Sequence, residues 1–260
     1  MRSHDDAVRD QFDPQAHAYL TSAVHASGQD LQRARELAQG ITPPLTTLLD
    51  VGCGAGHLSF ALALAFAEVV ATDPLPAMLA TVSAAASERG LTQIRTQQAA
   101  AVALPFAGGR FCLVASRYSA HHWRELPGAL RELRRVVKPH GYLLLIDQLG
   151  DESPLVDTHL QTMELLRDPS HVRNRSASQW RGLLAQAGFR LLEETRWPLR
   201  LDFASWITRM RTPPESVAAI RRLQTGAPRE VADGLTLEAD GSFTTQTGLF
   251  WAQTAATGTD

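Results

Sequence analysis

Short, almost continuously apolar runs alternate with segments whose apolar residues recur every three or four positions. The apolar runs are typical of strands that are buried on both faces. Before residue 150 they are Thr46–Val51, Val69–Asp73, Ile94–Gln98, Phe111–Ser116 and Tyr142–Gln148. The helical periodicity falls between them, at His57–Phe66, Pro76–Arg89 and Leu126–Val137. Strands alternating with helices predict a parallel sheet with helices on both faces.

The second half of the chain adds two strands and more helices. Strands are expected at Arg190–Trp197 and Phe243–Ala252, the first of them after a helix at Gln179–Ala187. That helix has a capping box at its start and a glycine directly after its end. About 45 residues separate the two strands, too many for a turn, and FASWITRM and PPESVAAIRRLQ within them have helical periodicity.

Composition narrows the class of protein. Apolar residues make up 44% of the 260 positions and the net charge is −2, so no general attraction to nucleic acid or anionic membranes is expected. The sequence shows neither a signal peptide nor a membrane-spanning run. Cys53 lies in a glycine turn and Cys112 in an apolar run, which does not suggest a disulfide framework. We expect a cytoplasmic protein with no nucleic-acid or membrane partner.

The sequence DVGCGAG joins the first strand to the first helix. Its glycines, Gly52, Gly54 and Gly56, allow a ligand to approach the backbone, and the helix N-terminus supplies N–H donors. About twenty residues on, Asp73 ends the second strand, where its carboxylate can accept hydrogen bonds from two ribose hydroxyls. This predicts an adenosine-type ligand at the carboxyl ends of the strands.

Two adenosine-type ligands can be distinguished here. The dinucleotide fingerprint G-x-G-x-x-G places its third glycine one position later than Gly56. Asp50, just before the turn, would repel a pyrophosphate. S-adenosylmethionine is cationic and has no phosphate, so it accounts for both observations, with Asp50 near its methionine end.

Several segments resemble class I S-adenosylmethionine-dependent methyltransferases, in the small-molecule branch (methyltransferase type 11) that includes ubiquinone and menaquinone biosynthesis enzymes. LLDVGCGAG resembles the first motif of that family, and TDPLPAML its second-strand motif. ALPF, FCLVASRYSAHHW and ALRELRRVVKPHGYLLLIDQ resemble the regions of the fourth and fifth strands. Together these segments cover roughly Thr46–Phe189, and QFDPQAHAYLTS resembles the segment that closes over the cofactor.

The pattern and the resemblance together predict an α/β fold, Rossmann-like and doubly wound, with a mostly parallel seven-stranded sheet and helical lid additions. No internal repeat divides the chain, so we expect a single methyltransferase domain over residues 1–260. Its expected parts are an N-terminal helical lid (1–44), a cofactor-binding core (45–198), a helical insertion (199–240), and the last strand and tail (241–260).

The predicted cofactor contacts are Asp50, Gly52, Gly54, Gly56, Asp73, Pro74, Met78, Ala101, Val102 and Tyr19. Met78 could pack near the adenine or in the core of its helix, and Tyr19 could line the pocket or only pack the lid. The family commonly has an acidic residue where this chain has Ala100. The adenine would therefore rely on backbone groups near Ala101 and Val102.

Two histidines follow the fourth strand, where the methyl acceptor lies in this fold. His121 or His122 could act as a general base, because an unperturbed imidazole titrates near neutrality. The alternative is a pair that only shapes the loop. We slightly favour His121 because the family often keeps a histidine there.

The segment RDPSHVRNRS offers further candidates. Arg167, His171, Arg173 and Arg175 could hold a carboxylate or phosphate of the acceptor. We favour simple solvent exposure for them.

The expected function is methyl transfer to a small organic molecule at O, C or N, by in-line displacement, without a metal. The motifs of amino-methylating and cytosine-methylating enzymes are missing from the sequence, and so is an acidic trio of the metal-assisted type. The alternatives are an NAD-dependent dehydrogenase and a non-catalytic S-adenosylmethionine-binding protein.

Overall fold

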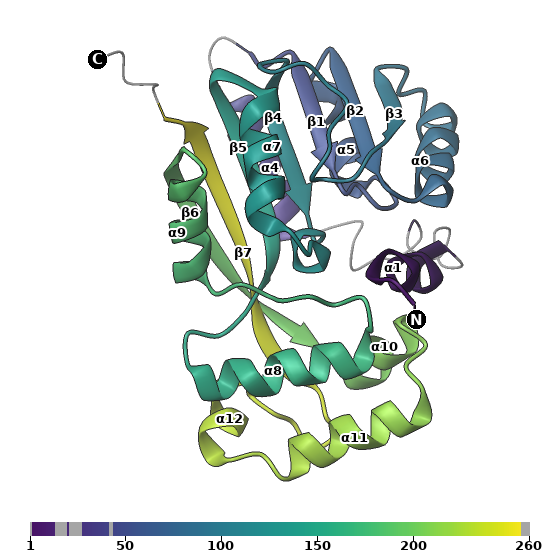
Figure 1. The fold of residues 1–260 in the computed structure, drawn as a ribbon, viewed down its shortest axis with the longest axis vertical. Coiled ribbons are helices and arrows are strands. Elements are labelled where there is room, and N and C mark those ends of the chain that lie inside the picture. Colours follow the sequence, from purple (N-terminus) through teal and green to yellow (C-terminus); the bar gives the residue numbers. More distant parts are fainter. Residues whose placement is uncertain (1, 14–19, 21–27, 42–43, 256–260) are drawn as a thin grey trace.

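A computed structural model describes residues 2–13, 20, 28–41 and 44–255 (Figure 1). Its strands are β1 (Thr47–Val51), β2 (Glu68–Asp73), β3 (Ile94–Gln98), β4 (Phe111–Arg117), β5 (Val137–Leu149), β6 (Phe189–Leu201) and β7 (Phe243–Thr254). They form one seven-stranded sheet in the order β3-β2-β1-β4-β5-β7-β6. β7 is antiparallel to both of its neighbours, β5 and β6, and the other neighbouring pairs are parallel. The predicted α/β class with a mostly parallel sheet is confirmed.

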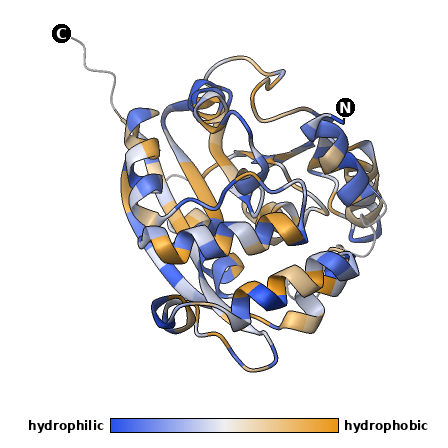
Figure 2. Ribbon diagram, turned by 60° about the horizontal axis from the view of Figure 1, so that its bottom comes forward, coloured by the Kyte–Doolittle hydropathy of each residue, from blue (hydrophilic) through white to orange (hydrophobic). Residues whose placement is uncertain are grey.

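Helices cover both faces of the sheet. They are α1 (His4–Phe12), α4 (Gln29–Gln39), α5 (His57–Leu62), η2 (Ala63–Ala65), α6 (Pro76–Glu88), η3 (Ala120–His122), α7 (Leu126–Val136), α8 (Pro154–Arg167), α9 (Ala177–Gln186), α10 (Phe203–Arg209), α11 (Pro214–Thr225) and α12 (Arg229–Gly234). One buried cluster joins the sheet to α7 and α9, and another joins it to α4 and α5. Figure 2 shows the result as apolar central strands among helices that carry both apolar and polar stretches.

A second layer of helices lies beyond one end of the sheet. Strands β6 and β7 extend past their neighbours, and α8, α10, α11 and α12 gather around this extension (Figure 1). The layer has its own buried cluster, which includes Leu160 of α8, Trp206 of α10 and Phe243 of β7. This layer faces the carboxyl ends of the parallel strands, so it can form one wall of a ligand site.

The structure corrects two expectations about elements. Strand β5 begins at Val137 rather than Tyr142, because Val137 pairs with Phe111 before the register shifts. The helix α8 was not predicted, and it joins the helices of the 199–240 segment in one layer. Two of its buried residues, Asp157 and Glu164, are charged, so the apolar stripe that reveals a helix is interrupted.

Within the part of the chain that the structure describes, no helix is both long and apolar enough to cross a lipid bilayer.

Candidate active site

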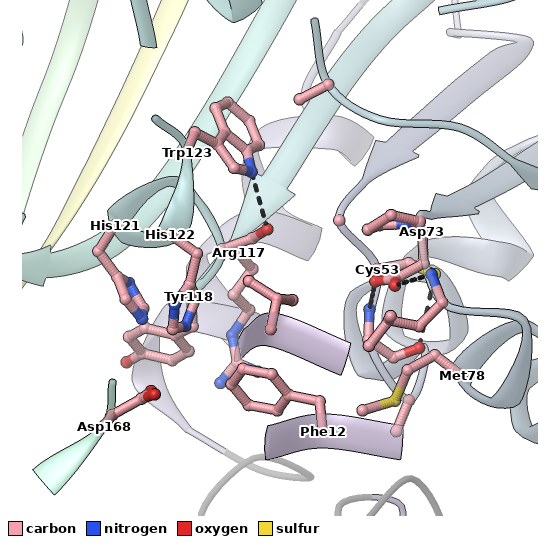
Figure 3. A pocket seen from close by; sticks show the side chains of 18 of the residues that line it. Phe12, Cys53, Asp73, Met78, Arg117, Tyr118, His121, His122, Trp123 and Asp168 are labelled. Atoms are coloured by element: carbon pink, nitrogen blue, oxygen red, sulfur yellow. Dashed lines mark hydrogen bonds between the residues drawn. The ribbon is translucent and has the colours of Figure 1, made fainter. Parts of the chain in front are cut away.

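A cavity of about 510 Å³ lies at the carboxyl ends of β1, β2 and β4. One side is formed by the glycine turn, Asp50, Asp73 and the start of α6. The other is formed by the loop after β4, which carries His121 and His122 (Figure 3). Residues of α1 and α10 complete it. The cavity is therefore the meeting point of the sheet, the N-terminal helix and the second helical layer.

The glycines of the turn have different surroundings. Gly52 has φ +67°, and a Cβ there would clash with the hydroxyl of Ser119. Gly52 and Gly54 line the cavity, and nothing lies within 4 Å of a Cβ built at Gly54. Gly56 is absent from the lining. It has φ +87°, and its Cβ would lie 2.9 Å from atoms of Phe60 and Val82, so the packing of α5 on α6 requires a glycine here.

Asp73 lies at the end of β2 and faces the glycine turn. Its carboxylate accepts hydrogen bonds from the backbone N–H groups of Gly54 (3.0 Å) and Leu75 (2.9 Å). Burial raises the pKa of Asp73 to about 6, although these two hydrogen bonds oppose the shift. Each carboxylate oxygen has one further lone pair, so ribose hydroxyls can still donate to it.

Asp50 is buried at the end of β1. Its Oδ2 accepts a hydrogen bond from the Ser59 hydroxyl (2.7 Å), whereas Oδ1 is buried and has no hydrogen-bond partner among the described residues. Burial raises the pKa of Asp50 to about 6. A buried carboxylate oxygen without a donor costs free energy, so this position fits a cationic or N–H-bearing ligand.

The predicted adenine contacts lie on the same side. Pro74 and Met78 line the cavity beside Asp73, and Met78 also packs against Leu75 in a small buried cluster. Ala101 and Val102 line it from the loop after β3, and Val102 is 46% exposed. Met78 is therefore both part of the cavity wall and packed against a buried residue. Tyr19 lies outside the described residues.

On the opposite side, His121 forms a dyad with Asp147 of β5. The Nδ1 atom of His121 lies 2.6 Å from Oδ1 of Asp147, and the backbone N–H of His121 donates to Oδ2 (3.0 Å). Burial alone would lower the pKa of His121, but the charge and hydrogen bond of Asp147 raise it above its usual value. Because a carboxylate only accepts, Nδ1 carries the proton and Nε2 is left as the basic nitrogen.

His122 has a different environment from its neighbour. Its Nδ1 lies 3.0 Å from the carbonyl oxygen of Ser170, and its ring centroid is 4.2 Å from that of His121. Burial, followed by the adjacent His121, lowers the pKa of His122 to about 3. A carbonyl accepts only, so this imidazole is neutral with its Nδ1 protonated. Its Nε2 is then a hydrogen-bond acceptor.

The basic segment after α8 supports the histidine loop. Backbone N–H groups of Val172 and Arg173 donate to the carbonyl of His121, at 2.9 and 3.0 Å. The ring of His171 lies behind His121, with centroids 5.9 Å apart, and Arg173 forms an ion pair with Asp157. His171, Arg173 and Arg175 do not line the cavity, but Arg167 does. Its guanidinium pairs with Glu164 instead of lying free at the surface.

Several residues of the site were missed in the sequence. Asp147 supports His121 without lining the cavity, and an aspartate at the end of an apolar run is the same signal that revealed Asp73. Leu199, Trp206 and Met210 reach the cavity from the end of β6 and from α10, far along the chain from the glycine turn. Their segment carried only helical periodicity.

Comparison with known proteins agrees with this geometry. Residues 49–145 match a family model described as a methyltransferase domain. The uncharacterized protein YafE of Escherichia coli is 42% identical over 205 residues, covering 79% of this chain and 99% of that protein. YcgJ of Bacillus subtilis, described as an uncharacterized methyltransferase, is 34% identical over 204 residues, covering 78% and 80%. The crystal structure of YcgJ aligns with a TM-score of 0.82 and 31% identity, over 87% of this chain and 98% of that one.

A third relative, the demethylmenaquinone methyltransferase of Thermus thermophilus, is 37% identical over 133 residues, covering 49% of this chain and 59% of that protein. The strand order, the antiparallel β7 and the cavity beside the glycine turn define the class as a Rossmann-like α/β methyltransferase. The chain belongs to the S-adenosylmethionine-dependent methyltransferase domain family. The predicted family is thereby confirmed.

Proposed function

We propose that this chain binds S-adenosylmethionine in the cavity and transfers its methyl group to a small organic acceptor that is held beside His121. The observation that carries the proposal is the pair of buried carboxylates beside the glycine turn, one of which has an oxygen with no donor. Asp73 would suit the ribose of either adenosine-type ligand. Asp50 discriminates between them, because it would repel a dinucleotide pyrophosphate and attract a ligand with an amine and a sulfonium.

Each part of the cofactor has candidate partners. Asp73 would accept hydrogen bonds from the ribose, and Asp50 would attract the positive methionine end. The backbone of Gly52 and Gly54 would lie against the ligand. The adenine would lie among Pro74, Met78, Ala101 and Val102. The contacts proposed for Gly56 and Tyr19 rest on the sequence motifs, since Gly56 lies behind the turn and Tyr19 outside the described residues.

The cofactor, when bound, supplies a methyl group that its sulfonium already activates. The protein must hold the acceptor in line with that methyl group, and such positioning can contribute up to about 7–11 kcal/mol. Helix α1 contributes His4, Val8 and Phe12 to the cavity wall, and so helps to exclude water.

His121 is the proposed base. Its Nε2 would accept the proton that the acceptor's O–H, N–H or C–H loses, and Asp147 would stabilise the imidazolium that forms. His122, with its pKa of about 3, stays neutral and would orient the acceptor through Nε2. Cys53 and Cys112 are free thiols, which fits the proposed cytoplasmic location.

Incubation with methyl-labelled cofactor and a metabolite extract, followed by mass spectrometry, tests this proposal. We expect a labelled product with the native protein and turnover about 10²-fold lower with His121→Ala. Cofactor affinity should be unchanged in that variant. His159→Ala, half-buried on α8 and outside the cavity lining, is the matched control and should be fully active. Equal turnover of His121→Ala and the native protein would exclude His121 as the base.

A further inference from the structure

The cavity continues beyond the histidines, away from the cofactor side. Figure 3 shows Asp168 and the two histidines on one side, Asp73 on the other, and Arg117 and Phe12 between them. The wall beyond the histidines comes from the end of β6, from α8 and from α10. Its apolar members are Leu199, Leu201, Trp206 and Met210. This part of the cavity is where the acceptor lies in the proposed function, and the inference below rests on that assignment.

Arg167 is a preorganised cation in this wall. Its side chain is only 11% exposed. Its Nε donates to the carbonyl of Trp206 (3.0 Å), and its Nη1 lies 3.1 Å from Oε2 of Glu164. The guanidinium also lies 4.8 Å from the centroid of the Trp206 ring. Nη2 has no hydrogen bond among the described residues, so one edge of a fixed guanidinium remains available to a ligand.

Trp206 supplies a second donor in the same wall. Its side chain is 1% exposed, and its indole Nε1 is buried with no hydrogen-bond partner in the part of the chain that the structure describes. An indole N–H and a guanidinium can only donate, so both groups require an acceptor. A buried donor without an acceptor costs roughly 1–3 kcal/mol.

Two carboxylates near Arg167, those of Glu164 and Asp168, already accept hydrogen bonds from other groups. Glu164 pairs with Arg167 through Oε2 and accepts from the Gln148 amide through Oε1 (2.7 Å). Asp168 accepts from the backbone N–H and the hydroxyl of Ser170, at 2.9 and 2.6 Å. Arg209, from α10, adds a further positive charge to this wall. The cofactor side is thus lined by the acids Asp50 and Asp73, whereas the far side carries Arg167 and Arg209 together with Asp168.

We propose that the methyl acceptor carries a carboxylate that binds at the Nη2 edge of Arg167, beside the indole N–H of Trp206. Its apolar body lies against Leu199, Leu201 and Met210, and its reacting atom faces His121. Charge-assisted hydrogen bonds to the carboxylate fix the orientation of the acceptor, which in-line transfer requires.

Calorimetry with two matched probes tests the carboxylate site. Protein saturated with S-adenosylhomocysteine, and the same protein without it, is titrated with 2-naphthoate and with 2-naphthamide. The two probes share one ring system and differ in the charge of the head group. We expect 2-naphthoate to bind at least about tenfold more tightly than the amide. Trp206→Phe and Arg167→Gln should each reduce this preference severalfold, and Arg167→Lys should retain part of it.

Arg181→Gln is the matched control, because Arg181 also pairs with a single glutamate, Glu194, but lies outside the cavity wall. It should leave the preference unchanged. Trp206→Phe keeps the packing of the ring, so it decides the matter even where Arg167→Gln fails to fold. Equal binding of the probes, no binding of 2-naphthoate, or an unchanged preference in Trp206→Phe would overturn the carboxylate site. Loss of S-adenosylhomocysteine binding alone would count against the proposed function instead.

Discussion

At the scale of single residues, two buried carboxylates define the cofactor side of the cavity. Asp50 and Asp73 lie on neighbouring strands, and burial raises the pKa of each to about 6. In the absence of a ligand, their ionised forms are held in an unfavourable environment. The protein therefore gives up stability to keep these groups, and a cationic ligand recovers it.

This cost makes a prediction about Asp50→Asn. The folded-state pKa of Asp50, about 6, lies above the unfolded value near 3.9, so the folded protein binds more protons between these values. Native stability is then fully present below about pH 4 and decreases as the pH rises through 6. The free energy of unfolding of Asp50→Asn, minus that of the native protein, should be roughly 2–3 kcal/mol higher at pH 8 than at pH 4.

Urea unfolding of the ligand-free native protein and the variant at both pH values measures the effect. The difference between the two proteins cancels the contribution of other titrating groups. An identical effect of Asp50→Asn at pH 4 and pH 8 would show that ionisation of Asp50 does not lower the free energy of unfolding.

The His121–Asp147 dyad makes a second prediction. Asp147 raises the pKa of His121, and only the neutral imidazole can act as a base, so methyl transfer should decline as the pH falls through that pKa. In Asp147→Asn the acidic limb of the rate profile should move to lower pH. The plateau rate should fall about 10²-fold, because the imidazolium loses its partner. A pH–rate profile with an unmoved acidic limb would contradict the dyad.

Residue identity alone could reveal only part of this site. Asp50, Asp73 and the histidines follow strands that were recognisable from their apolar runs. Asp147 required knowledge that β4 and β5 are neighbours, with Arg117 opposite Ile146, so that His121 and Asp147 meet just beyond. Trp206 and Met210 are brought in by the second helical layer, whose position no local pattern encodes.

At the scale of elements, the packing of α5 on α6 depends on Gly56. In Gly56→Ala the new Cβ would meet Phe60 and Val82 at 2.9 Å, in a left-handed backbone conformation. We expect a loss of about 2–4 kcal/mol in the free energy of unfolding. Gly182 in α9 is the matched control, since a Cβ there meets nothing within 4 Å, and Gly182→Ala should stabilise by about 0.5–1 kcal/mol. Equal effects of the two variants in denaturant unfolding would contradict this account.

Helix α1 is the second element with a testable role. Two of its side chains form hydrogen bonds to the rest of the protein. The Nε2 atom of His4 lies 2.9 Å from the carbonyl oxygen of Ser170, and the side-chain amide of Gln11 donates to the carbonyl oxygen of Met210 (2.8 Å). None of its residues is fully buried, so removing residues 2–12 should leave the remaining protein folded. Because α1 lines the cavity, S-adenosylhomocysteine should bind roughly tenfold more weakly. Unchanged affinity, with an unchanged circular dichroism spectrum, would show that α1 plays no part in binding.

Elements with a regular pattern were predicted well, and irregular ones were not. The strand runs and α6, α7 and α9 follow from apolar periodicity, with differences of a few residues at their ends. Helix α8 was missed because Asp157 and Glu164 occupy buried positions. They are tolerated there because Arg173 and Arg167 pair with them, a compensation that becomes visible only in three dimensions.

At the scale of the whole molecule, two parts of the fold form the cavity, namely the sheet and the second helical layer. The sheet supplies the acids and the glycine turn, and the second helical layer supplies apolar and cationic side chains. The layer is joined to the sheet by the long strands β6 and β7, and surface pairs such as Arg200 with Glu238 bridge its segments. Changes in the helical layer can thus alter the acceptor while the cofactor side is kept.

The central claim is that the cavity binds S-adenosylmethionine through Asp73 and the glycine turn. Isothermal titration of the native protein with S-adenosylhomocysteine should show one site per chain. The same titration of Asp73→Asn, which has nearly the same shape but no charge, should give a Kd about 10- to 100-fold higher. The absence of any heat with the folded native protein, or an equal Kd in Asp73→Asn, would contradict the account.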